Sequence, residues 1–164
     1  MLQVINLYVV YELSGSAIQL GLTGLFQAIP ILAIGIFSGA LADVFDKRKL
    51  LTLVIVAGFA SALTLAVLAN VKVLEVWHIF AFTSLASAIT IISGPSRISY
   101  MSRLVPSNHL LNAITLNSTL TQISFFIGPI VAGVSIDSVG INNAYLINAL
   151  FYLPALLTLW MIKT

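Results

Sequence analysis

Cysteine is absent from the sequence, so disulfide bonds and thiol chemistry are excluded. Charge is also scarce: seven basic and five acidic residues make up 7% of the 164 residues, whereas a soluble domain carries about 25% charged residues. Hydrophobic residues account for 60% of the chain. Because so few charged side chains cannot keep the surface of a soluble domain hydrated, the composition predicts a protein that lies in lipid.

The uncharged stretches of the chain have the length of membrane spans. A helix rises about 1.5 Å per residue, so about 20 apolar residues cross a hydrocarbon core of about 30 Å. The predicted spans are 17–42, 50–70, 76–96, 110–136 and 144–162. Residues 1–11 are also apolar but reach only about half way across, and we interpret them as the outer half of a span whose beginning is missing. We therefore expect an all-α membrane protein with six transmembrane helices, the first of them truncated.

The cations predict the orientation of these spans. Alternating sides from the partial first span places most of the cations together: Lys47, Arg48, Lys49, Arg97, Arg103 and Lys163. Only Lys72 falls on the other side. Basic residues concentrate in cytoplasmic loops, so the Lys47–Lys49 side is predicted to be cytoplasmic in a multi-pass protein of the cytoplasmic (inner) membrane.

Sequence patterns of enzymes and of nucleic-acid-binding proteins are missing. The chain has no Gly-x-x-x-x-Gly-Lys, His-Glu-x-x-His or Gly-x-Ser-x-Gly pattern, so we expect neither an enzyme nor a cofactor. The cations form no basic stripe interleaved with aromatic residues, which argues against a nucleic-acid partner. His78 and His109 are predicted on opposite sides of the membrane and form no metal site.

The loop between the second and third predicted spans is the most informative segment. Gly35 and Gly39 are four residues apart, a spacing that lets a neighbouring helix approach closely. Asp43 follows one turn later at the membrane edge, where it can face a helix N-terminus. Lys47 and Arg48 begin the basic triplet that would anchor the loop to the cytoplasmic leaflet. The triplet alone would also fit an ordinary positively charged loop.

Taken together, Gly39, Leu41, Asp43, Lys47 and Arg48 resemble the signature that the major facilitator superfamily carries between its second and third helices. This sequence has Val44 where the general motif has a basic residue, and Asp46 where it has glycine. The run from Asp43 to Lys49 is similar to the branch of the superfamily that contains exporters of macrolides and of enterobactin.

A second motif lies in the span 110–136. Its residues Gly128, Pro129, Ala132 and Gly133 resemble the Gly-Pro-x-x-Gly-Gly motif of the drug–proton antiporters in this superfamily, with Ala132 in place of one glycine. A proline inside a helix removes one hydrogen bond and kinks it, and small neighbours allow close packing. A proline-kinked helix of an unrelated membrane protein remains the alternative.

Polar residues inside a span mark either a transport pathway or a helix–helix contact. Thr115, Ser118, Thr119 and Gln122 share one helical face. Both interpretations stay open for this face, as a wall of a substrate cavity or as a packing surface. Gln19, Thr23 and Gln27 form a similar stripe on the second helix, for which packing is favoured. The middle of every predicted span is uncharged, so no proton carrier is evident there.

The resemblance implies that the chain is the amino-terminal half of a major facilitator fold. It also implies a secondary transporter that couples proton movement to the efflux of a small amphipathic compound, such as a drug, a macrolide or a siderophore. The expected partners are the lipid bilayer, this small-molecule substrate and the missing carboxy-terminal half, which the second and fifth helices would face. A truncated or accessory membrane protein that transports nothing is the alternative function.

Overall fold

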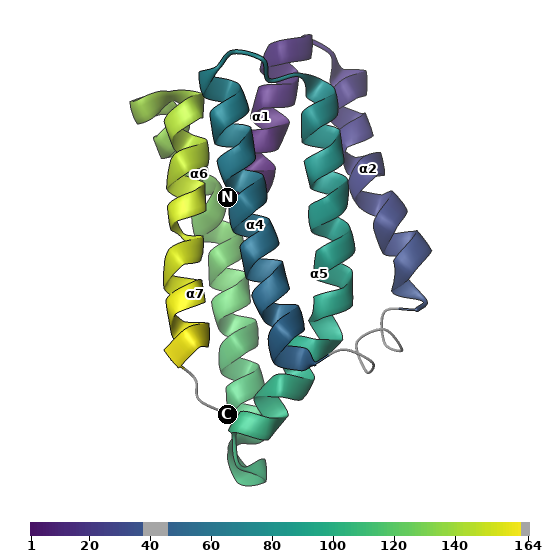
Figure 1. Cartoon of the computed structure of the whole chain (residues 1–164), viewed down its shortest axis with the longest axis vertical. Helices are drawn as coiled ribbons and strands as arrows, with labels where there is room; N and C mark the ends of the chain where they lie inside the picture. Colours follow the sequence, from purple (N-terminus) through teal and green to yellow (C-terminus); the bar gives the residue numbers. More distant parts are fainter. Residues whose placement is uncertain (38–45, 162–164) are drawn as a thin grey trace.

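The computed structural model describes residues 1–37 and 46–161 (Figure 1). Within these ranges the chain forms helices joined by turns and contains no strand. The helices are α1 (Leu2–Ser14), α2 (Ala17–Gly35), α4 (Lys47–Asn70), α5 (Val76–Leu104), the 3-10 turn η1 (Ser107–His109), α6 (Leu110–Leu150) and α7 (Tyr152–Met161). The all-α fold class predicted from the sequence is confirmed.

The helices form one bundle (Figure 1). Helix α4 contacts α5, α6 and α7, while α2 packs along α5. The short helix α1 lies against α2, α5 and α6. The α1–α2 turn and the α4–α5 connection lie at one end, and the α5–α6 turn lies at the other (Figure 1).

Four helical stretches in the described ranges are long and apolar enough to cross a membrane. They are Ala17–Gly35, Arg48–Asn70, Val76–Ser102 and Ser107–Thr158. The chain is therefore a multi-pass membrane protein. Helix α1 has 13 residues, which at about 1.5 Å per residue is shorter than the hydrocarbon core.

The last of these stretches contains a reversal of the chain direction. It has 52 residues, and a straight helix of that length would measure about 78 Å, more than twice the hydrocarbon core. Gly140 interrupts it with φ 80° and ψ 168°, a backbone conformation that only glycine adopts readily. Figure 1 shows the chain turning there, with α7 running back toward the end of the bundle where α6 begins. The number of six spans stays a prediction.

Local capping fixes where two of the long helices begin. The side chain of Asp46 accepts hydrogen bonds from the backbone N–H groups of Arg48 (2.9 Å) and Lys49 (3.2 Å) at the start of α4. At the start of α5, the backbone N–H of Glu75 donates to Nδ1 of His78 across 3.1 Å. His78 also stacks on Trp77. These bonds satisfy backbone and side-chain groups that a helix start would otherwise leave without partners.

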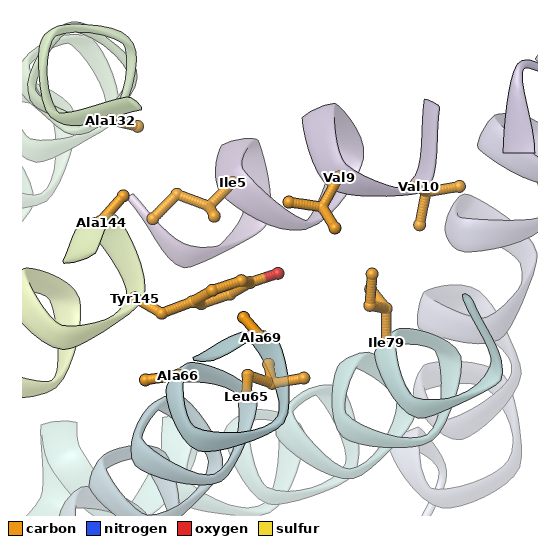
Figure 2. Packing of buried hydrophobic residues seen from close by; sticks show 10 residues of the cluster. All are labelled: Ile5, Val9, Val10, Leu65, Ala66, Ala69, Ile79, Ala132, Ala144 and Tyr145. Atoms are coloured by element: carbon orange, nitrogen blue, oxygen red, sulfur yellow. The ribbon is translucent and has the colours of Figure 1, made fainter. Parts of the chain in front are cut away.

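The buried core joins α1, α4, α5 and α6. Figure 2 shows its ten side chains: Ile5, Val9, Val10, Leu65, Ala66, Ala69, Ile79, Ala132, Ala144 and Tyr145. Four of them are alanines, and small residues let helices approach closely where lipid gives no hydrophobic driving force between them. This close packing holds α1, although it is short, against the longer helices.

Candidate functional site

A cavity of about 390 Å³ lies between α1, α2 and α5 and is called the polar cavity below. Six of its lining residues are polar but uncharged: Gln3, Asn6, Gln27, Thr83, Ser87 and Thr90. Its remaining lining includes Phe82, Ile31 and Ile91. Polar side chains inside a membrane bundle are costly unless they are bonded or functional, so this concentration marks a candidate binding site.

One wall of the polar cavity is a pair of glutamines. Nε2 of Gln3 in α1 donates to Oε1 of Gln27 in α2 across 3.0 Å. A glutamine amide has two N–H donors and one oxygen with two lone pairs. The pair therefore joins the two helices and still has the N–H donors of Gln27 and the oxygen of Gln3 for a ligand.

The inner wall is a hydrogen-bonded chain across three helices. Tyr145 of α6 donates its hydroxyl to Oδ1 of Asn6 across 3.0 Å. Nδ2 of Asn6 in turn donates to Oγ1 of Thr83 across 3.2 Å. All three side chains are buried, with exposed fractions of 0% for Tyr145, 3% for Asn6 and 9% for Thr83. Buried bonds of this kind hold polar side chains in fixed orientations.

A larger cavity of about 910 Å³ lies among α4, α5, α6 and α7, with Met1 on its wall. Its lining includes Arg97, Tyr100 and Asn148. The hydroxyl of Tyr100 and Nδ2 of Asn148 are buried without a hydrogen-bond partner in the described part of the chain. Orphaned polar atoms are costly, so the wall of this cavity is less organised than that of the polar cavity, whose side chains bond one another.

The four residues predicted to line a substrate cavity lie elsewhere. Thr115, Ser118, Thr119 and Gln122 of α6 are all exposed and belong to neither cavity. The hydroxyl of Thr115 donates to the Leu111 carbonyl, and that of Thr119 donates to the Thr115 carbonyl, each across 2.9 Å. Their role as a cavity wall stays a prediction.

The antiporter-like motif of α6 divides between two environments. Ala132 is fully buried in the core, whereas Pro129 is exposed. Gly133 is also exposed, and a Cβ there would meet no atom within 4 Å. A Cβ at Gly128 would lie 3.1 Å from the backbone nitrogen of Met1, so this glycine accommodates the start of α1. Within the motif, Ala132 thus packs in the core, Gly128 lies close to Met1, and Pro129 and Gly133 are exposed.

The loop signature falls mostly outside the described residues. Gly39, Leu41 and Asp43 lie there. Lys47 begins α4, and the backbone N–H of Arg48 donates to the Asp46 side chain. Of the other cations predicted to be cytoplasmic, Lys163 lies outside the described residues. The function of the signature and the side on which these cations lie stay predictions.

Comparison with known proteins decides the family. The family described as transmembrane secretion effector, within the major facilitator superfamily, matches residues 1–164. The chain belongs to this family. The resemblance drawn from the sequence motifs is confirmed, and the family consists of transporters rather than enzymes.

This major facilitator chain is similar to three curated transporters of bacteria. The uncharacterized MFS-type transporter YfiS of Bacillus subtilis is 28% identical over 90% of this chain and 34% of its own length. The staphyloferrin A transporter of Staphylococcus aureus is 27% identical over 87% of this chain and 36% of its own length. Macrolide efflux protein A of Streptococcus pyogenes is 26% identical over 99% of this chain and 40% of its own length. The chain thus spans 34–40% of the length of these relatives. No solved structure matches the chain.

Sequence reasoning missed most of the polar cavity in this major facilitator chain. Thr83, Ser87 and Thr90 recur at helical spacing within the predicted span 76–96, and this signal could have been found. Gln27 was assigned to helix packing. It does bond Gln3, but it also lines the cavity. No sequence pattern connects Asn6 with Tyr145, because the two are 139 residues apart.

Proposed function

We propose that the chain forms the amino-terminal part of a secondary transporter that exports a small amphipathic compound in exchange for protons. The observation that carries the proposal is the polar cavity, a concentration of bonded polar side chains inside the membrane bundle of a major facilitator protein. Similarity to a macrolide efflux protein and to a staphyloferrin transporter supports efflux of a drug or a siderophore. Proton coupling rests on the likeness of residues 128–133 to the antiporter motif.

The lining of the polar cavity fits an amphipathic compound. Amide and hydroxyl groups of Gln27 and Ser87 can bond the polar edge of a ligand, while Phe82 and Ile91 can pack on its carbon skeleton. Because the described lining is uncharged, the cavity favours neutral oxygen and nitrogen groups over a fully ionised ligand. This composition suits a macrolide-like compound better than a polycarboxylate.

The transport cycle requires parts beyond these residues. We propose that a carboxy-terminal half packs on α2 and α6, and that the two halves rock around the central site. The cations of 47–49, Arg103 and Lys163 would then lie on the cytoplasmic side.

The proposal is tested in the full-length transporter, reconstituted in liposomes with a proton gradient and supplied with erythromycin and a set of uncharged dyes. We expect saturable, gradient-dependent flux that Gln27→Leu and Thr83→Val each reduce severalfold. Thr64→Val is the matched control, because Thr64 is exposed on α4 and donates to the Ala60 carbonyl, away from both cavities. Absence of flux would favour the non-transporting alternative, whereas flux that resists both cavity variants would contradict the polar cavity as the binding site.

A further inference from the structure

Tyr145 lies behind the polar cavity rather than in its lining. Its ring is packed in the core between α1 and α4, beside Ile5 and Ala69 (Figure 2). The residues that line the polar cavity include Asn6 and Thr83 but not Tyr145. The hydroxyl of Tyr145 reaches the cavity only through Asn6.

The hydrogen bond from Tyr145 fixes the orientation of the Asn6 amide. Oδ1 accepts from the tyrosine hydroxyl, so Nδ2 is directed to Oγ1 of Thr83. The flipped amide would present its N–H groups to the tyrosine oxygen and leave the tyrosine hydrogen without an acceptor. A buried donor without a partner is costly, so the observed orientation is favoured. One hydrogen on Nδ2 of Asn6 then remains for the cavity.

The bond also determines what Thr83 can offer. Threonines in these helices commonly donate to the carbonyl one turn earlier, as Thr64 and Thr90 do. No such backbone bond is made by Thr83 within the described residues; its oxygen accepts from Asn6 instead. A hydroxyl that accepts one hydrogen bond still has its own hydrogen to donate. The chain therefore runs in one direction, from Tyr145 through Asn6 and Thr83 into the cavity.

We propose that Tyr145 is a positioning residue for substrate recognition: it orients Asn6 so that Asn6 and Thr83 present N–H and O–H donors to an acceptor oxygen of the transported compound. This inference rests on the proposed function and deepens it. The preferred substrates carry a carbonyl, ether or hydroxyl oxygen at the edge that enters the polar cavity. An analogue that lacks this oxygen leaves both donors unpaired and is rejected.

The first test is the kinetics of erythromycin flux in the full-length transporter. Tyr145→Phe removes only the hydroxyl, and we expect the apparent KM to rise about three- to tenfold, the scale of one lost hydrogen bond, at unchanged Vmax. Tyr8→Phe is the matched control, because Tyr8 is an exposed tyrosine of α1, and it should leave KM unchanged. In an Asn6→Ala background, Tyr145→Phe should have no further effect on KM, since the donor that it orients is gone.

Three outcomes of this experiment would overturn the positioning role. They are an unchanged KM in Tyr145→Phe, an equal effect of Tyr145→Phe with and without Asn6, and a loss of Vmax and protein yield at constant KM. Absence of flux in the unsubstituted protein would instead contradict the proposed function.

A second measurement distinguishes failure of the positioning role of Tyr145 from failure of the proposed transport function. Hydrogen exchange of the Asn6 side-chain amide, followed by NMR with ¹⁵N-asparagine and assigned with Asn6→Ala, reports the amide orientation without any transport. We expect slow exchange in the unsubstituted protein and in Tyr8→Phe, and exchange at least tenfold faster in Tyr145→Phe. Equal exchange rates in all three proteins would contradict the orienting role even if transport is intact.

Discussion

Gly58 of α4 lies directly against the ring of Tyr152 in α7: a Cβ at position 58 would be 2.5 Å from Cε1 and 2.8 Å from Cζ of that ring. Real Cβ atoms do not approach other atoms so closely. The absence of a side chain at Gly58 therefore leaves room for the Tyr152 ring against α4.

We expect Gly58→Ala to lower the stability of the purified protein by about 1–3 kcal/mol, the usual cost of inserting a methyl group into a packed contact. Thermal unfolding in detergent measures the change. Gly24→Ala is the matched control, because a Cβ there would meet no atom within 4 Å. Tyr152→Leu should restore stability to the Gly58→Ala protein. Equal unfolding of Gly58→Ala and Gly24→Ala would show that the ring moves aside freely.

The cap of α4 gives a second prediction. Asp46→Ala removes the acceptor for the N–H groups of Arg48 and Lys49 and should cost about 1 kcal/mol. Asp46→Asn keeps an oxygen at the cap and should cost only a few tenths of that. The order of thermal midpoints, with the alanine variant lowest, checks the prediction. Identical midpoints for the two variants would mean that the cap contributes nothing measurable.

The loop signature predicts a role in the transport cycle for Asp43. In the full-length transporter we expect Asp43→Asn to reduce efflux sharply while membrane insertion stays normal, because an acid at a helix end can pair with a helix N-terminus or a cation in only one conformational state. Asp137→Asn, at an exposed acid near the end of the predicted span 110–136, is the control. A normal efflux rate for Asp43→Asn would reduce the signature to a loop that sets topology.

Topology can be tested with fusions at five positions. Reporters placed after Lys49, Arg103 and Lys163 should report the cytoplasm, and those after Val73 and Asn142 should report the outside. The expectation follows from the cation distribution. The α4–α5 connection and the α5–α6 turn do lie at opposite ends of the bundle (Figure 1). A single inverted reporter would contradict the predicted span assignment.

Residues 1–164 alone should not transport. Thr115, Ser118, Thr119 and Gln122 are exposed, so no second wall encloses a substrate over that face. Phe125 and Phe126 are also exposed on α6, and we expect dimers, aggregates or rapid proteolysis of this chain. Reconstitution in liposomes under a proton gradient, with a panel of dyes, measures the result. Saturable flux by a monodisperse monomer would contradict this prediction.

Features of this structure that depend on neighbouring residues in the chain are predicted from the sequence more readily than contacts between distant residues. The all-α fold and the membrane environment follow from composition and from uncharged runs, which are local properties. The reversal at Gly140 lies between the predicted spans 110–136 and 144–162, because Asp137 divides the two uncharged runs there. Helix α5 also continues through Gly94 and Pro95 to Leu104, beyond the predicted span 76–96, and ends where Val105, which precedes Pro106, is extended.

The polar cavity was harder to predict because its walls come from three helices. Periodicity identifies which residues share a face of one helix, but it does not say which faces meet. The polar face of α6 has the stronger pattern in sequence and yet is exposed, whereas Asn6 and Gln3 are the only amide side chains in a short apolar segment, residues 1–11. The hydrogen bond between Asn6 and Tyr145 is seen only in the folded chain, where α6 lies beside α1.

The exposed face of α6 has a consequence for motion. On this face, Thr115 and Thr119 each donate their hydroxyl hydrogen to a carbonyl of their own helix. A partner helix that packs on this face therefore gains van der Waals contact without needing to supply an acceptor for either hydroxyl. Separation of such a contact leaves neither hydroxyl without a partner in lipid.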